Sequence, residues 1–179
     1  MGSDATRVLR GAVAGAAAAG VWAAQQPLDK RIFGVDYDDA EFLGTLVIRT
    51  RGRDAYALGT VLHIANGAAF GALYALVAPS LPGPGPVRGL AAGMAEHLGT
   101  WQLTRFLHLH PAGAQFPRLW GNHAAFAQAT WRHVLFGGVL GAVERRLNPP
   151  AGEAAPAGED VAATNGHGDV GHLVTAREA

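Results

Sequence analysis

The sequence contains no cysteine, and only 16% of its 179 residues are charged. Without cysteine the chain forms no disulfide, no thiolate nucleophile and no cysteine-ligated zinc or iron–sulfur site. Its formal net charge is zero, so it lacks the basic footprint of a nucleic-acid-binding protein and we expect no nucleic-acid partner. The phosphate-binding loop and the Gly-x-Ser-x-Gly and His-Glu-x-x-His motifs are also missing, so no motif predicts an enzyme.

Four long apolar segments stand out in what remains. They cover residues 8–26, 55–78, 87–108 and 119–143. Each has roughly 19 to 25 residues, and at about 1.5 Å per residue a helix of that length crosses a hydrocarbon core of about 30 Å. The pattern predicts an all-α fold, a four-helix transmembrane bundle with several spans in the plasma membrane. The lipid bilayer is then its partner, and a homo-oligomer is left open.

A charged residue lies near the middle of two of these segments, Glu96 in the third and Arg132 in the fourth. A charge at mid-span costs about 2.5 to 3.5 kcal/mol on an insertion scale, whereas each large apolar residue returns only about 0.3 to 0.6 kcal/mol. The third segment therefore needs its neighbours in order to insert. Because of this weakness a soluble helical binding domain stays open as an alternative.

Two other parts of the chain have their own character. The first connection contains Asp38, Asp39 and Glu41 before an apolar stretch that ends at Ile48, which is typical of a short capped amphipathic helix. From residue 148 to 179, Pro, Ala, Gly and acidic residues dominate without periodicity, which predicts a disordered tail. The chain thus divides into a membrane domain, 1–147, and a tail, 148–179.

The segments also show an internal repeat made of two similar helical hairpins. Arg-Gly-x-x-x-Gly opens the first and third segments, and His-x-x-x-Gly-x-x-x-Gly lies in the second and fourth. Glycines four residues apart share one helix face and let helix backbones approach closely in lipid. The sequence therefore predicts helix packing at four glycine pairs: Gly11 and Gly15, Gly67 and Gly71, Gly89 and Gly93, Gly137 and Gly141.

Polar side chains fall on the inward faces of the segments and predict an intramembrane polar centre. Its members are His63, Asn66, Glu96, His97, Arg132 and His133. Ionisable groups inside a membrane face one another or a cavity and are candidates for function. The blander interpretation is a satisfied structural network, in which Glu96 pairs with Arg132 and the histidines bond to carbonyls or to Asn66.

Two functional interpretations remain beside the structural one. A glutamate and several histidines can relay protons or line the path of a small solute. Alternatively, His63 and His133 occupy equivalent repeat positions and could ligate a haem, or Glu96 and His97 could join them around a divalent metal. The usual haem-attachment and bundle-metal spacings are missing, so no cofactor is predicted.

The repeated motifs give the chain a family resemblance. The order is Arg10–Gly15, an acidic loop, His63–Gly71, Arg88–Gly93 and His133–Gly141. It resembles small uncharacterised bacterial four-span inner-membrane proteins of the YagU-like kind. The resemblance implies a plasma-membrane protein and carries over no catalytic residue. Cationic residues flank the spans almost equally on both sides, and the short turn and the tail favour termini in the cytoplasm.

Overall fold

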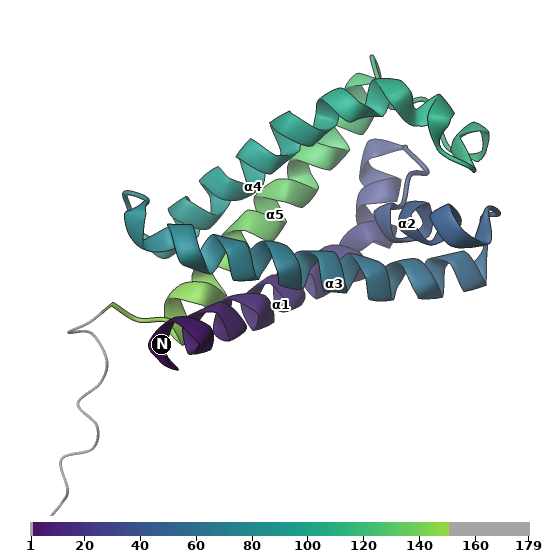
Figure 1. Cartoon of the computed structure of the whole chain (residues 1–179). Coiled ribbons are helices and arrows are strands. Elements are labelled where there is room, and N and C mark those ends of the chain that lie inside the picture. Colours follow the sequence, from purple (N-terminus) through teal and green to yellow (C-terminus); the bar gives the residue numbers. More distant parts are fainter. Residues whose placement is uncertain (1, 151–179) are drawn as a thin grey trace, which may run out of the picture. The chain divides into compact units, whose positions relative to one another are not determined.

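The computed structural model describes residues 2–150, and in this range it contains helices and no strand. The long helices are α1 (Gly2–Phe33), α3 (Arg53–Val77), α4 (Gly85–Trp101) and α5 (His123–Leu147), with the short α2 (Asp39–Ile48) between α1 and α3 in the chain (Figure 1). Three 3₁₀ segments complete the order: η1 (Ala78–Ser80), η2 (Gln102–Leu109) and η3 (Gly113–Gln115). The all-α fold is thereby confirmed. Residues 151–179, most of the predicted disordered tail, lie outside the described residues.

The predicted end of the first helix is wrong. Pro27 lies inside α1, which continues to Phe33 and stops where Gly34 adopts a φ of 66°. A proline in a helix interior removes one backbone hydrogen bond and costs roughly 3 kcal/mol. The turn around Pro27 carries Gln26 and Asp29, both completely buried and hydrogen-bonded to other elements. These tertiary contacts hold the helix together across the proline.

The third predicted helix differs mainly at its C-terminal end, and the fourth is shifted at both ends, since α5 ends at Leu147 and not at residue 143. The third is α-helical only to Trp101 and goes on as the 3₁₀ segment η2. The fourth begins later than predicted, at His123, because the Asn122 side chain caps it by accepting hydrogen bonds from the backbone N–H groups of Ala124 and Ala125.

The predicted short helix of the first connection is α2. The Asp38 side chain caps it by accepting a 3.0 Å hydrogen bond from the Glu41 backbone N–H. Helix α2 lies along α3, and a side chain on Gly44 or Gly59 would overlap the backbone of the other helix. These two glycines therefore create a close helix contact that lies outside the repeated motifs.

The glycine pairs lie where two helix pairs cross. Helix α1 packs on α3 with Gly11 and Gly15 against Gly67 and Gly71. Helix α4 packs on α5, with Gly89 and Gly93 against Gly137 and Gly141. A Cβ atom on Gly137 would stand 2.5 Å from the Gly89 carbonyl oxygen, so the backbones themselves are in contact. Both crossings use the equivalent glycines of the repeated motifs.

The two hairpins join through α1 and α5, which pack on each other, while α3 and α4 diverge from the turn that links them. In Figure 1 the turn lies at the left, and the space between α3 and α4 widens to the right, towards α2 and η2. The space between the hairpins is where the polar side chains gather.

Side chains are distributed in the reverse of the usual order for a water-soluble protein. Most buried apolar residues are alanines, and the largest fully buried side chain is that of Arg132. The other buried polar residues include Gln26, Asp29, His63, His97, Gln128, His133 and Glu144. Many large apolar residues, in contrast, are exposed, among them Leu9, Val13, Val61, Leu73, Leu76, Leu98 and Leu103.

Among residues 2–150, one helical stretch is long and apolar enough to cross a membrane by length and composition, namely Arg53–Ser80. Less than a third of its apolar window is buried within the protein. Only the second of the four predicted spans therefore meets that standard by itself. The other three are diluted by glycine, alanine and the polar residues that face the interior.

Neighbouring glycines on α5 provide a test of the helix crossing. We expect Gly137→Ala to destabilise the protein by about 1 to 3 kcal/mol, because the methyl group overpacks against α4. Gly138 has no atom within 4 Å of its hypothetical Cβ, so Gly138→Ala should be neutral or stabilising by up to about 1 kcal/mol through helix propensity. Thermal unfolding of both variants measures the difference, and equal shifts would contradict the close crossing.

Candidate functional site

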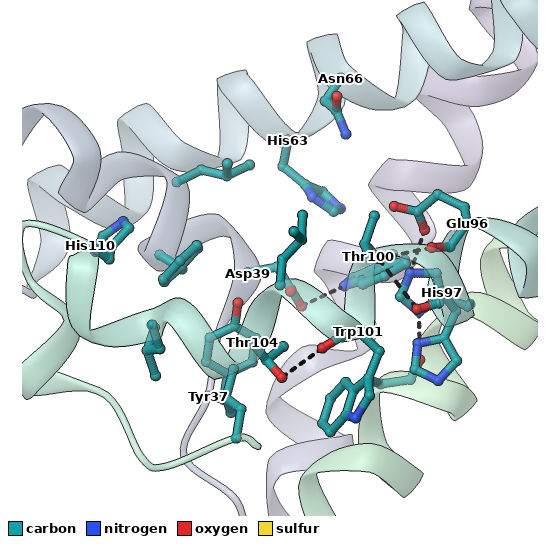
Figure 2. A pocket seen from close by; sticks show the side chains of 18 of the residues that line it. Tyr37, Asp39, His63, Asn66, Glu96, His97, Thr100, Trp101, Thr104 and His110 are labelled. Atoms are coloured by element: carbon teal, nitrogen blue, oxygen red, sulfur yellow. Dashed lines mark hydrogen bonds and ion pairs between the residues drawn. The ribbon is translucent and has the colours of Figure 1, made fainter. Parts of the chain in front are cut away.

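A cavity of about 630 Å³ lies between the two hairpins. Its wall takes side chains from α1, α2, α3, α4, α5 and η2 (Figure 2). Five of the six predicted polar residues line it: His63, Asn66, Glu96, His97 and His133. The sixth, Arg132, is buried beside it and contacts other partners. A volume of a few hundred cubic ångströms is the usual size of a small-molecule site.

Glu96 and His133 form an acid–base pair on the cavity wall. The Glu96 Oε2 atom lies 2.6 Å from His133 Nε2, and His133 Nδ1 lies 2.7 Å from the Ala129 carbonyl oxygen. A carbonyl only accepts, so Nδ1 carries a proton and donates it. One further proton is then shared between Nε2 and the carboxyl group. The pair is neutral overall, either as two uncharged groups or as an imidazolium with a carboxylate.

His97 has a defined protonation pattern as well. Its Nε2 lies 3.0 Å from the Thr130 hydroxyl, which donates its own proton to the Phe126 carbonyl oxygen. The hydroxyl must therefore accept from His97, so Nε2 carries the proton and, in the neutral ring, Nδ1 keeps a free lone pair. The ring centroids of His97 and His133 are 4.6 Å apart.

His63 is a polar group of the cavity that has an open hydrogen-bonding position, and His110 is another. Its side chain is 8% exposed, and its Nε2 has no hydrogen-bond partner among the described residues. The ring packs edge-on against Trp22, with centroids 5.3 Å apart, and points into the cavity in Figure 2. A buried polar atom without a partner is costly in an empty protein, which marks this position as one where a ligand can bind.

The expected ion pair between Glu96 and Arg132 is wrong. Arg132 instead binds Asp29 through two hydrogen bonds, Nε to Oδ2 at 2.7 Å and NH2 to Oδ1 at 2.6 Å. Its third nitrogen binds Asp39 at 2.5 Å, and it also donates to the Tyr37 carbonyl oxygen at 2.9 Å. The planar guanidinium matches a carboxylate with two parallel hydrogen bonds, a geometry that Glu96, already bonded to His133, does not offer.

Asp29 is the important residue that the sequence pattern missed. It accepts further hydrogen bonds from the side chains of Gln128 at 2.8 Å and Gln25 at 2.6 Å. The side-chain oxygen of Gln25 in turn accepts a hydrogen bond from the Trp131 indole. Pro27 suggested that Asp29 belonged to a loop. The available signal was its spacing of four residues from Gln25, which places both on one helix face if the helix continues.

Together Asp29, Arg132 and Asp39 form what we name the arginine clamp. It joins α1, α5 and α2, and the Trp22 indole also donates to Asp39 at 3.2 Å. Two carboxylates share one guanidinium, so the clamp carries one surplus negative charge. Asp39 lines the cavity, which brings that charge to the cavity wall.

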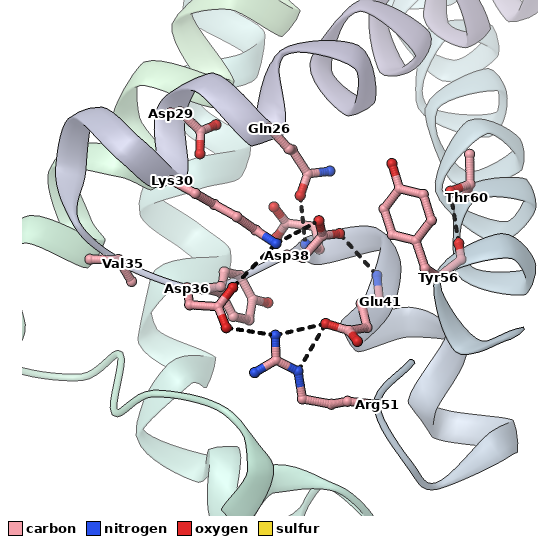
Figure 3. Close-up of polar contacts among 12 residues, drawn as sticks. Gln26, Asp29, Lys30, Val35, Asp36, Asp38, Glu41, Arg51, Tyr56 and Thr60 are labelled. Carbon is pink, nitrogen blue, oxygen red and sulfur yellow. Dashed lines mark hydrogen bonds and ion pairs between the residues drawn. The ribbon is translucent and has the colours of Figure 1, made fainter. Parts of the chain in front are cut away.

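A second charged cluster ties the connections together at the same end of the bundle (Figure 3). Arg51 binds Asp36 and Glu41, and Lys30 lies 3.4 Å from Asp36 and 3.1 Å from Asp38. Slight burial raises the pKa of Asp36, but Arg51 and Lys30 outweigh it and hold the pKa below its usual value. Asp36 is largely exposed, so this pair adds little to stability.

The arrangement of His63 and His133 does not fit a haem with two histidine ligands. Both rings pack edge-on against the single Trp22 ring, at 5.3 and 4.7 Å between centroids. Both nitrogens of His133 already bind Ala129 and Glu96, so neither is free for iron. Among the described residues no group of three or more histidine or carboxylate side chains is placed to hold a metal ion.

The arginine clamp gives a stability test with a matched control. We expect Asp29→Asn to destabilise the folded protein by about 3 to 5 kcal/mol, because it leaves the buried guanidinium without its main carboxylate. Asp36→Asn removes an exposed carboxylate from an ion pair and should cost less than about 1 kcal/mol. Denaturant unfolding of the two variants measures both values. A small effect of Asp29→Asn would show that the clamp does not hold the helices together.

Known proteins provide no template for this site. Comparisons of the chain with protein-family models, with curated proteins and with solved structures found no match. The interpretation of the site therefore depends on the contacts and chemistry of its own residues.

Proposed function

We propose that this chain is an integral membrane protein that binds a small solute in the cavity between its two hairpins. The observation that carries the proposal is the reversed distribution of side chains, with Arg132 and Asp29 inside and leucines and valines outside. In water the opposite arrangement is favourable. In lipid the polar groups have to face one another, and the large apolar side chains face the acyl chains.

The proposed spans are α1, α3, α4 continued by η2, and α5. Helices α3 and α5 have 25 residues each, about 37 Å at 1.5 Å per residue, which exceeds the hydrocarbon thickness of about 30 Å. No charged residue lies between Asp54 and Arg88. Glu96 and Arg132, the charges that made the sequence marginal, both bond inside the bundle. Because these side chains bond to neighbouring helices and do not face lipid, the free-energy cost of placing them in a membrane is reduced.

The remaining parts of the proposal follow from the chain's pattern. They are a plasma-membrane location, termini in the cytoplasm, and kinship with the YagU-like inner-membrane proteins. The bundle's solute site has the size of a small-molecule cavity and an unpartnered imidazole nitrogen on its wall. A purely structural network would fill the cavity and give the imidazole nitrogen a hydrogen-bond partner.

Fractionation of the tagged full-length chain tests the membrane part of the proposal. We expect the protein to stay in the membrane pellet after an alkaline carbonate wash and to need detergent for release, because its exposed surface is apolar. A peripheral and an integral membrane protein of the same cells serve as controls. Release as a monodisperse species without detergent would show a soluble bundle and would overturn the four-span arrangement.

A second candidate function is proton transfer, favoured by the short contact between Glu96 and His133. Glu96 is partly exposed to the cavity and shares one proton with His133. A proton relay needs such a pair, in which one group exchanges its proton with the cavity and passes it to the other. In vesicles carrying the purified protein, an imposed pH gradient should then collapse faster than in empty vesicles. Glu96→Gln keeps a hydrogen bond to His133 but has no titratable proton, so its rate should equal that of empty vesicles. An unchanged rate would exclude the relay.

A further inference from the structure

We infer that the solute of this cavity is an amphipathic organic cation, an ammonium group on an apolar body. The inference deepens the proposed function and depends on it. Four observations support it: the surplus negative charge of the wall, the kind of polar atoms it presents, the aromatic rings beside them, and an apolar mouth.

The charge of the wall is negative on balance. Asp39 and Glu96 line the cavity, and no lysine or arginine does. Glu96 with His133 is neutral as a pair, whereas the arginine clamp has two carboxylates for one guanidinium and so a net negative charge, which Asp39 brings to the wall. In a low-dielectric interior an uncompensated charge is unfavourable, so a cation that enters the cavity is stabilised and an anion is repelled.

The polar atoms of the inner end are mainly acceptors. Beside the two carboxylates, neutral His97 has a free Nδ1 lone pair, because its Nε2 proton goes to Thr130. His63 Nε2, buried and without a partner, accepts a hydrogen bond when its ring proton is on Nδ1. An ammonium group donates hydrogen bonds and accepts none, so it complements this set.

Aromatic rings border the same polar groups. Trp22 touches both His63 and His133, and Phe136 packs edge-on against Trp22 and Phe70 with centroids 6.0 and 5.6 Å apart. All three rings line the cavity. The faces of aromatic rings attract organic cations, and this attraction grows when the cation has lost its water.

The mouth of the cavity is apolar. Leu46 of α2 and Leu103, Phe106 and Leu109 of η2 line the cavity and are exposed at the same time. Along their helices they lie nearer the α2 and η2 end of the bundle than His63 and Glu96, and Figure 2 places His110 of this end away from Glu96 and His97. A ligand whose charged end reaches the inner groups therefore leaves its apolar part among leucines. A small hydrated cation or a sugar has few polar partners there, chiefly His110 and Thr104.

Three brominated probes with the same chain and different head groups test the inference. They are 11-bromoundecylammonium, 11-bromoundecanol and 11-bromoundecanoate, whose bromine quenches tryptophan fluorescence on contact. The full chain carrying Trp120→Phe and Trp131→Phe keeps Trp22 and Trp101, both on the cavity wall. We expect saturable quenching by the ammonium probe, with half-saturation at a concentration about ten-fold below that of the alcohol, and the weakest binding by the carboxylate.

Variants separate the site from partition into detergent. Asp39→Asn should weaken the ammonium probe about ten-fold and leave the alcohol unchanged, since it removes the surplus charge of the arginine clamp and keeps a hydrogen-bond acceptor for Arg132. Asp54→Asn removes an exposed carboxylate outside the cavity and should change neither probe. Asn66→Phe narrows the cavity and should weaken the ammonium and alcohol probes alike. Because the alcohol probe reports an intact cavity, a misfolded Asp39→Asn variant is recognised by its loss of alcohol binding.

The outcomes distinguish the two proposals. If the alcohol or the carboxylate binds as tightly as the ammonium, the inference about the cation is wrong and the solute site stands. If quenching by every probe is linear, and Asn66→Phe does not change it, the probes only dissolve in detergent. The solute site of the proposed function then fails together with the inference.

Discussion

The close contact of helix backbones at the glycine crossings is the constraint on which the rest of the structure depends. At Gly15 with Gly67, and at Gly89 with Gly137, no side chain fits between the helices. Each hairpin is therefore a thin two-helix layer whose large side chains can only point outward or towards the other hairpin. Since the outward faces carry the leucines and valines, the seam between the hairpins receives the polar groups.

Helix α5 organises that seam with two adjacent residues. Arg132 reaches α1 and α2 through Asp29 and Asp39, while His133 reaches α4 through Glu96. Arg132 and Asp29 are buried groups, and leaving either unpaired would cost several kcal/mol. The Arg132 contact thereby ties the two hairpins together on the α1 and α5 side. On the other side α3 and α4 diverge, and the cavity lies between the hairpins there.

The helical pattern and the inward faces were predictable from the sequence because both follow from spacing along one helix. The glycine pairs, and the grouping of His63, Glu96 and His133, depend only on which residues share a face. Partner choice was not predictable in the same way. Glu96 and Arg132 were the charges near the middle of the predicted spans, so pairing them was natural, but Asp29 had been assigned to a loop after Pro27. Whether a helix continues past a proline depends on tertiary contacts that local sequence does not contain.

The arginine clamp has two carboxylates for one guanidinium, and this excess of negative charge is a reason to expect a ligand in the cavity. A network that only fixed the helices would pair Arg132 with Asp29 alone, since that bidentate contact satisfies most of the guanidinium. Asp39 adds a second carboxylate at the cavity wall, which gives the clamp a net negative charge there. This charge and the unpartnered nitrogen of His63 favour a ligand that brings a positive charge and a hydrogen-bond donor. Features that destabilise a protein locally are expected where a ligand restores the balance, and a cation restores this one.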